Sequence, residues 1–248
     1  KIDAVINLAG ANLGAKRWND TSKKEFYDSR INTTRLLVEF ISKMKEKPEA
    51  LISASGVDYY GDTGSEDVYE DSMPAADFLG TLTHDWELEA SKAENFGIRA
   101  VRVRTGFVLA SDSEAVRKMV LPYRFFVGGP LGSGKQYVSW IHIDDLVRIY
   151  LFAVDNTNVK GAVNAASPCP VTMKEFSSGI GKALHRPSFF PVPEFALKLI
   201  AGEMSSVVLS GRKALPGKVL LLGYNFEFVD VFDAWKEVLS MRSCQDSS

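Results

Sequence analysis

Three short strand-like runs, separated by segments of helical periodicity, place the strongest limits on how this chain can fold. The runs lie at Ala4–Leu8, Ala50–Ser55 and Arg99–Thr105, and their apolar and β-branched content is typical of buried strands. Between them, residues 19–45 and 77–95 carry apolar positions three and four residues apart, as helices do. Parallel strands need helical crossovers, so this alternation predicts an α/β fold with a doubly wound parallel sheet.

The second half of the chain continues the alternation in shorter pieces. Asp144 is placed to cap one helix, and Thr172 with Glu175 forms a capping-box pattern at the start of another. Helices are expected over residues 113–127, 144–154 and 172–184, and short strands over 136–140 and 162–165.

The character of the sequence changes after Arg186. Pro187, Pro191 and Pro193 indicate an extended linker, and apolar helical segments follow it. We therefore expect an α/β domain over residues 1–186, a small α-rich C-terminal domain over 187–241, and a disordered tail over 242–248.

Composition excludes several classes of protein. The formal net charge of −2 gives no basic excess for nucleic acid, and no apolar run approaches the roughly 18 residues of a membrane span. The two cysteines, Cys169 and Cys244, are too far apart in the sequence to suggest a disulfide framework or a zinc site, so no metal is expected. A reducing compartment follows, either the cytoplasm or an organelle matrix or stroma.

Several motifs resemble those of a known family. Asn7-Leu8-Ala9-Gly10 is similar to the strand-end motif of short-chain dehydrogenases, and Trp140 to Leu146 resembles the "F-V-H-V-D-D-L" element of their extended members. Further matching stretches are Ser53-Ala54-Ser55 with Tyr59-Tyr60-Gly61, Arg30 to Thr34, Gly128 to Gln136, Asn164 to Pro168, and Phe190 to Phe195. In order and spacing, they resemble the YfcH-type sugar-nucleotide epimerases of the NAD-dependent epimerase/dehydratase superfamily. The resemblance implies that residues 1–186 form a Rossmann-like NAD(P)-binding domain and that the residues after Pro187 form the family's small C-terminal domain.

The resemblance implies that two βα units are missing from this sequence. Such units span on the order of 60 residues and carry the Gly-rich turn that holds the pyrophosphate at a helix N-terminus. The sequence opens directly on an expected central strand without an initiator Met, so we expect a fragment or a native N-terminus elsewhere. NADP(H) is the expected cofactor of the intact protein, with weak or absent binding by this chain alone.

The remaining cofactor contacts are expected at the carboxyl ends of the strands, where ligands of open α/β sheets bind. From the resemblance, the expected cofactor-binding residues are Asn7, Leu8, Ala9, Gly10, Asn32, Ser53, Ala54, Ser55, Arg104, Thr105, Gly106 and Phe107.

The catalytic pattern departs from that of the family. Typical relatives use a Tyr-x-x-x-Lys pair with a Ser, but residues 77–86 contain neither Tyr nor Lys, and Gly56 stands at the serine position. Ser55 and His84 are the candidate catalytic residues that remain. Each has a plainer interpretation, Ser55 as a local hydrogen-bonding group and His84 as a surface histidine. Tyr59, Tyr60 and His142 are interpreted mainly as packing or structural groups.

Three functions are therefore compatible with the sequence. The first is an NAD(P)-dependent oxidoreductase or sugar-nucleotide epimerase that acts on a small molecule such as a nucleotide sugar. The second is a non-catalytic NADP(H)-binding sensor or scaffold, which the missing Tyr and Lys favour. The third is an interaction module, if the apolar segments Val207–Leu209 and Val219–Leu222 are exposed. A homo-oligomer is one candidate assembly.

Overall fold

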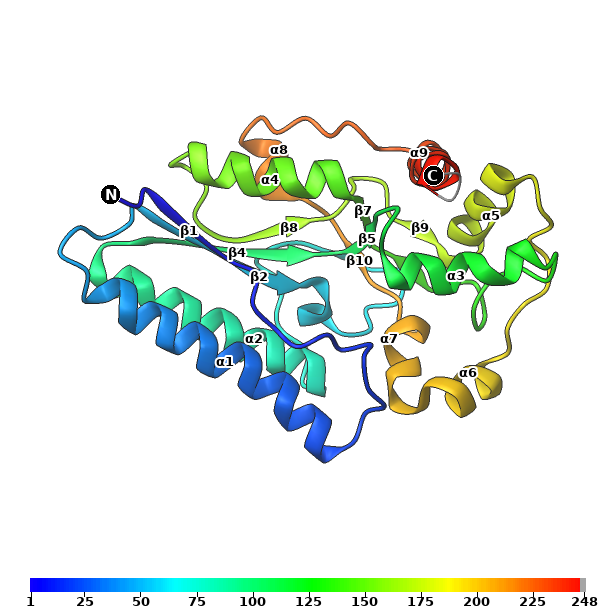
Figure 1. Cartoon of the computed structure of the whole chain (residues 1–248), viewed down its shortest axis with the longest axis horizontal. Coiled ribbons are helices and arrows are strands. Elements are labelled where there is room, and N and C mark those ends of the chain that lie inside the picture. Colours follow the sequence, from blue (N-terminus) through cyan, green and yellow to red (C-terminus); the bar gives the residue numbers. More distant parts are fainter. Residues whose placement is uncertain (246–248) are drawn as a thin grey trace.

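A four-stranded parallel sheet is the centre of the computed structural model, which describes the backbone of residues 1–245 and the side chains of residues 1–240. Its strands are β1 (Ala4–Asn7), β2 (Ala50–Gly56), β4 (Arg99–Thr105) and β8 (Gly161–Ala165), in the order β1-β2-β4-β8 (Figure 1). Ala50 of β2 is opposite Ala4 on one side and Arg99 on the other, and all three pairings are parallel. The predicted adjacent parallel strands are confirmed.

Helices cover both faces of this sheet, as a doubly wound fold requires. Figure 1 shows α1 (Asp20–Ser42) and α2 (Phe78–Ser91) along one face and α4 (Ile143–Asp155) along the other. Neighbouring residues of β2 point to opposite faces: Leu51 packs in the cluster with α1 and α2, and Ile52 packs in the cluster with α4. In the part of the chain that the structure describes, no helix has both the length and the apolar character to cross a membrane.

The buried face of α1 leaves out some of its large apolar residues. Leu36 and Phe40 have the helical spacing of core residues, but each is 65% exposed. The stripe that faces the protein consists of Phe26, Ile31, Thr34, Val38 and Ile41. This stripe brings the polar Thr34 against the sheet, which matters for the site.

One of the two predicted helix caps is present and the other is wrong. Thr172 and Glu175 form the predicted capping box of α5 (Met173–Leu184). The N-cap of α4, however, is His142 and not Asp144, because the Asp144 amide donates to His142 Nδ1 at 3.2 Å. His142 Nε2 lies 2.7 Å from Glu237 Oε2, and its ring stacks on Phe228, so this histidine has a structural role, as expected.

Shorter elements surround the central sheet. Three small two-stranded pairs form: β5 with β7 and β10 with β3 are parallel, and β6 with β9 is antiparallel. Their bounds are β3 (Asp67–Val68), β5 (Phe107–Leu109), β6 (Tyr137–Val138), β7 (Trp140–His142), β9 (Val171–Thr172) and β10 (Lys213–Ala214). The remaining helices are α3 (Glu114–Arg124), α6 (Glu194–Ala201), α7 (Ser205–Leu209), α8 (Gly217–Leu221) and α9 (Val231–Gln245), with 3-10 turns η1 (Val57–Tyr60), η2 (Lys92–Phe96) and η3 (Gly202–Met204).

The C-terminal segment shares its hydrophobic cores with the sheet. Val219 and Tyr224 belong to the cluster under α4, and Trp235 belongs to a cluster with Trp140 and Phe176. A domain boundary at residue 186 stays a prediction, but the packing is continuous across it.

The predicted disordered tail needs a correction. Helix α9 includes residues 242–245, because the helix that Trp235 and Val238 anchor propagates beyond them. Residues 246–248 lie outside the described residues.

We expect Trp235→Ala to lower the free energy of unfolding by about 3–5 kcal/mol, because it removes a fully buried side chain between α9 and α5. Urea unfolding followed by circular dichroism measures this. Lys236→Ala, at the exposed neighbouring position, is the matched control and should change stability little. A loss below about 1 kcal/mol for Trp235→Ala would mean that the segment does not share this core.

Candidate functional site

The end of β1 is tied to its neighbours by Asn7, which is buried. Its Nδ2 atom donates to Thr34 Oγ1 at 3.0 Å and to Ser53 Oγ at 3.3 Å. Thr34 Oγ1 also accepts from Trp86 Nε1 at 2.9 Å. Asn7 and Ser53, both predicted cofactor contacts, thus join β1, β2 and α1 beneath the exposed residues 8–10.

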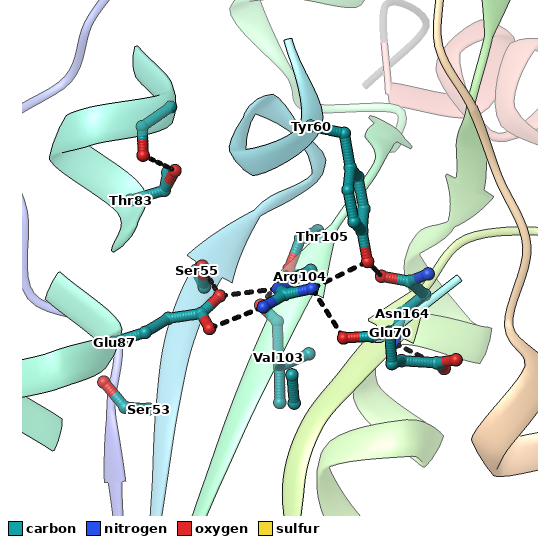
Figure 2. Close-up of polar contacts among 12 residues, drawn as sticks. Ser53, Ser55, Tyr60, Glu70, Thr83, Glu87, Val103, Arg104, Thr105 and Asn164 are labelled. Atoms are coloured by element: carbon teal, nitrogen blue, oxygen red, sulfur yellow. Dashed lines mark hydrogen bonds and ion pairs between the residues drawn. The ribbon is translucent and has the colours of Figure 1, made fainter. Parts of the chain in front are cut away.

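A buried polar network follows at the ends of β2 and β4 (Figure 2). Arg104 binds Glu87 of α2 through two hydrogen bonds, from Nε to Oε1 at 2.8 Å and from Nη2 to Oε2 at 2.9 Å. Ser55 Oγ donates to the same Oε1 atom at 2.7 Å. The Ser55 hydroxyl is therefore committed to a buried carboxylate that is already paired with a guanidinium.

Tyr60 completes this network on the other side of Arg104. Its hydroxyl accepts from Arg104 Nη1 at 2.8 Å and donates to Asn164 Oδ1 at 2.7 Å. The Tyr59 ring lies against the same guanidinium, with 3.4 Å between Arg104 Cζ and the ring centroid. Tyr59 and Tyr60 are both buried, which agrees with their interpretation as packing groups.

The charge states in this network follow from burial and pairing. Desolvation raises the pKa of Tyr60 to about 12, although Arg104 and Asn164 act in the opposite direction. Burial disfavours the charge of Arg104, but the Glu87 carboxylate outweighs it and raises the pKa of Arg104. At neutral pH Tyr60 is protonated and Arg104 is charged. We call the buried network of Ser55, Tyr60, Glu87 and Arg104 the fixed floor of the site.

A second group of polar residues stands at the same strand ends, and its first member is Arg30 of α1. The Arg30 guanidinium carbon lies 3.0 Å from the position that a Cβ on Gly10 would take. It stands over the Trp86 ring at 5.2 Å, and Nη1 donates to the Phe26 carbonyl at 3.2 Å. Burial lowers the pKa of Arg30, and the charge of Asp58 counteracts this in part.

Asp58 is the second member and lies beside Gly56. Its Oδ2 atom is 3.3 Å from the position of a Cβ on Gly56. Asp58 Oδ1 pairs with Arg212 from the C-terminal segment, and Arg212 Nε also donates to the Gly61 carbonyl at 3.0 Å. We call Gly10, Arg30, Gly56, Asp58 and Arg212 the strand-end site.

The two predicted catalytic residues are not hydrogen-bonded to each other. Ser55 donates to Glu87, whereas His84 Nδ1 lies 3.3 Å from Asp85 Oδ1 on the partly exposed side of α2. Asp85 Oδ2 accepts from Tyr27 at 2.8 Å. The centroid of the His84 ring is 6.2 Å from that of Tyr59. The catalytic roles of Ser55 and His84 stay predictions.

The other predicted contacts occupy varied positions. Asn32 lies on the exposed side of α1, where its Oδ1 atom accepts from Arg35 at 3.3 Å. Gly106 approaches β7 closely, because a Cβ there would meet the Ser139 carbonyl oxygen at 2.6 Å. Phe107 begins β5, and its amide donates to the same oxygen at 2.7 Å. Thr105, Gly106 and Phe107 thus hold the sheet edge together through their backbone, and Ala54 is half-buried.

The sequence reading missed Arg30, Thr34, Asp58, Glu87 and Arg212. Arg30 and Thr34 could have been found, because they are four residues apart and continue the stripe of Phe26 along α1. Asp58 and Glu87 carry a weaker indication, in the sequence, of a place at the site. Arg212 carries no such indication, because its partner Asp58 is 154 positions away in the chain.

Comparisons with known proteins agree with this architecture. The model of the NAD dependent epimerase/dehydratase family matches residues 1–166, and that of a domain of unknown function, DUF1731, matches residues 192–238. Epimerase family protein YfhF of Bacillus subtilis is 40% identical over 242 residues, which are 97% of this chain and 79% of that protein. The chloroplastic SDR39U1 homolog of Arabidopsis thaliana is 41% identical over 95% of this chain and 68% of its own length. The crystal structure of human epimerase family protein SDR39U1 with NADPH superposes with a TM-score of 0.89 at 35% identity, covering 97% of this chain and 82% of that one.

We expect Tyr60→Phe to reduce the loss of stability at high pH. Between pH 10 and about 12 the unfolded chain releases the Tyr60 proton and the folded chain keeps it, so the free energy of unfolding falls as pH rises through this window. This contribution is on the order of 2 kcal/mol and is absent in the variant. Urea unfolding at several pH values measures the slope, and Tyr69→Phe, at an exposed position, is the control. Equal slopes in the parent and Tyr60→Phe would contradict the assigned pKa.

Proposed function

The chain belongs to the NAD-dependent epimerase/dehydratase family, and on that premise we propose that it binds NADP(H), with the nicotinamide end at the carboxyl ends of β1, β2 and β4. The observation that carries this proposal is the set of polar and charged residues at these strand ends, where ligands of open parallel sheets bind. Asn7 and Ser53 are hydrogen-bonded to each other there. A Cβ at Gly10 would stand 3.0 Å from Arg30 and one at Gly56 would stand 3.3 Å from Asp58, so the two charged side chains lie directly over these glycines.

The residues present suit the nicotinamide half of a dinucleotide. Asn7 and Ser53 fix the edge of the sheet, and the exposed residues 8–10 offer backbone groups beside it. The bound dinucleotide would supply hydride chemistry, while this chain's residues hold and orient it. No G-x-G-x-x-G turn occurs near the strands of these 248 residues.

The geometry favours a sensor or scaffold over a typical family enzyme. Ser55, Tyr60 and Arg104 are saturated by partners inside the protein, and α2 has neither Tyr nor Lys at the positions of the usual pair. Where a typical member has side chains that transfer a proton, the described part of this chain has the fixed floor, whose side chains are bound to one another. We propose non-catalytic NADP(H) binding as the function that this floor supports best.

A second candidate, oxidoreductase or epimerase activity on a small molecule such as a nucleotide sugar, rests on Asp58. This carboxylate stands beside Gly56, where typical members have a serine, and Arg212 orients it. In this alternative, Asp58 accepts the proton that the family's tyrosine would take. Turnover of sugar nucleotides that is lost in Asp58→Asn, with folding intact, would favour this candidate.

The interaction-module hypothesis has less support. Val219 is fully buried in the core, and Val208 packs against the cluster of Trp140, whereas Leu221 is 89% exposed. These apolar segments thus serve mainly the protein's own core. The reducing compartment and the oligomeric state stay predictions.

We expect this 248-residue chain to bind NADPH weakly in calorimetry, and the same chain preceded by two βα units with a Gly-rich turn to bind it in the micromolar range. Backbone N–H groups at the first helix N-terminus supply most of the recognition of the pyrophosphate. A version in which the Gly-rich turn is replaced by alanines is the matched control and should bind like the short chain. Lack of binding by the longer chain would refute the proposed function, and micromolar binding by the short chain would refute the assigned role of the turn.

A further inference from the structure

Two segments of the chain share a charge pattern that differs from that of the whole protein. Residues 115–143 and 176–193 contain six Lys or Arg residues and no Asp or Glu, although the whole chain has a formal net charge of −2. The first segment includes most of α3, and the second includes most of α5 and the proline linker. Figure 1 shows this linker leaving α5 and passing the end of α3 before it enters α6.

Large apolar side chains stand out from the surface where the two segments meet. The Phe190 amide donates to the Gly128 carbonyl at 3.1 Å, so the loop after α3 and the linker lie side by side. Five apolar residues of these two loops are between 47% and 69% exposed: Phe125, Phe126, Val127, Phe189 and Phe190. We call these five residues the apolar ridge.

The backbone is held in an unfavourable conformation at the ridge. Among residues 1–245, the only non-glycine residues with a positive φ are Phe126, with a φ of 63°, and His185, with a φ of 54°. The Cβ atom disfavours this region, and bulky residues adopt it rarely. Such conformations persist where the surrounding structure holds them, and they cluster at functional sites. At Phe126, this backbone carries a side chain that the core of the protein does not use.

A basic cavity adjoins the apolar ridge. Its volume is about 540 Å³, and it forms where the linker folds back on α5, since the Arg186 amide donates to the Gly181 carbonyl at 2.8 Å. Lys182 and Arg186 form no ion pair with a carboxylate among residues 1–240. Arg186 lies instead over the Phe126 ring, with 4.4 Å between Cζ and the ring centroid. The lining contains no carboxylate, and its side chains are those of Ser178, Lys182, His185, Arg186, Ser188 and Phe189.

This combination of charge and apolar surface fits an anionic lipid bilayer. Lys and Arg bind phosphate oxygens, and exposed phenylalanines enter the boundary between headgroups and acyl chains. A second copy of the chain fits less well, because two ridges in contact would bring the cations Lys182 and Arg186 of both copies together. A nucleic acid strand also fits less well, because its backbone needs a groove of basic groups, whereas these two cations share one cavity.

We propose that the apolar ridge and the adjoining cavity form a docking surface for bilayers that contain anionic phospholipids. Lys182 and Arg186 bind the headgroup phosphate in the cavity. Phe125 and Phe189, each 69% exposed, enter the boundary region beside it. The docking surface does not depend on the proposed NADP(H) binding, because none of its residues belongs to the strand-end site.

The test is sedimentation of the 248-residue chain with vesicles of phosphatidylcholine alone and of equal parts phosphatidylcholine and phosphatidylglycerol. We expect the partition coefficient to be at least about tenfold higher on the anionic vesicles and to fall as salt is added. Lys182→Glu/Arg186→Glu should lower the partition onto anionic vesicles by about tenfold or more, because the charges now repel the lipid. Phe125→Ser/Phe189→Ser should lower it by about tenfold through the lost apolar contact.

Two double variants are the matched controls. Lys45→Glu/Lys47→Glu makes the same change of charge at two exposed lysines that follow α1. Leu36→Ser/Phe40→Ser removes two apolar side chains that are each 65% exposed on α1. Both should partition like the parent chain. Circular dichroism and thermal unfolding establish that each variant is folded.

Several outcomes would overturn the docking surface. The proposal fails if the chain binds neither kind of vesicle or binds both kinds equally. It also fails if the control variants lose as much binding as the ridge and cavity variants, since general charge or apolar exposure would then explain the effect. Titrations with inorganic phosphate and with a single-stranded oligonucleotide complete the test. Binding of either by a chain that does not partition onto vesicles would assign the cavity to a soluble anion or to nucleic acid instead.

Discussion

The buried ion pair between Arg104 and Glu87 fixes the relative positions of most elements around the site. Each of these charges would be strongly unfavourable alone in the interior, so each requires the other with good geometry. Their two hydrogen bonds join β4 to α2. The remaining donors of Arg104 reach the Tyr60 hydroxyl and the carbonyl of Glu70, which ties η1 and the loop after β3 to the same point. A shift of any one element would leave a buried charge or hydroxyl without its partner.

This arrangement also determines which groups are available to a ligand. The hydroxyls of Ser55 and Tyr60 are both bound within the network. Arg30 and Asp58 stand beside Gly10 and Gly56 at the same strand ends. Because these two hydroxyls are already bound, the proposed function assigns the ligand contacts to the strand ends and not to a Tyr and Lys pair.

The C-terminal segment is part of the site and not an appendage. Arg212 reaches back to Asp58 and to the Gly61 carbonyl, and β10 pairs with β3 next to it. Farther along, Trp235 packs against Phe176 in a core that also contains Trp140. Because one side chain of this segment orients the carboxylate of the strand-end site, stability of the segment and the properties of the site are coupled.

The sequence by itself determined the sheet, its parallel order and most helices, because these follow from local periodicity: Leu51 and Ile52 alternate between the two faces, and Thr172 with Glu175 caps α5. It also led to Arg104 and Ser55 through their places at the strand ends. Only the tertiary structure decided that they turn to Glu87, that Asn32 faces solvent, and that Arg30 stands beside Gly10. The tertiary structure also decided that His142 caps α4 and that Arg212 pairs with Asp58. The physical reason is that a periodic pattern specifies which face of an element is buried. The partner of a buried polar group, by contrast, is a residue far away in the chain, and no local pattern in the sequence indicates which residue that is.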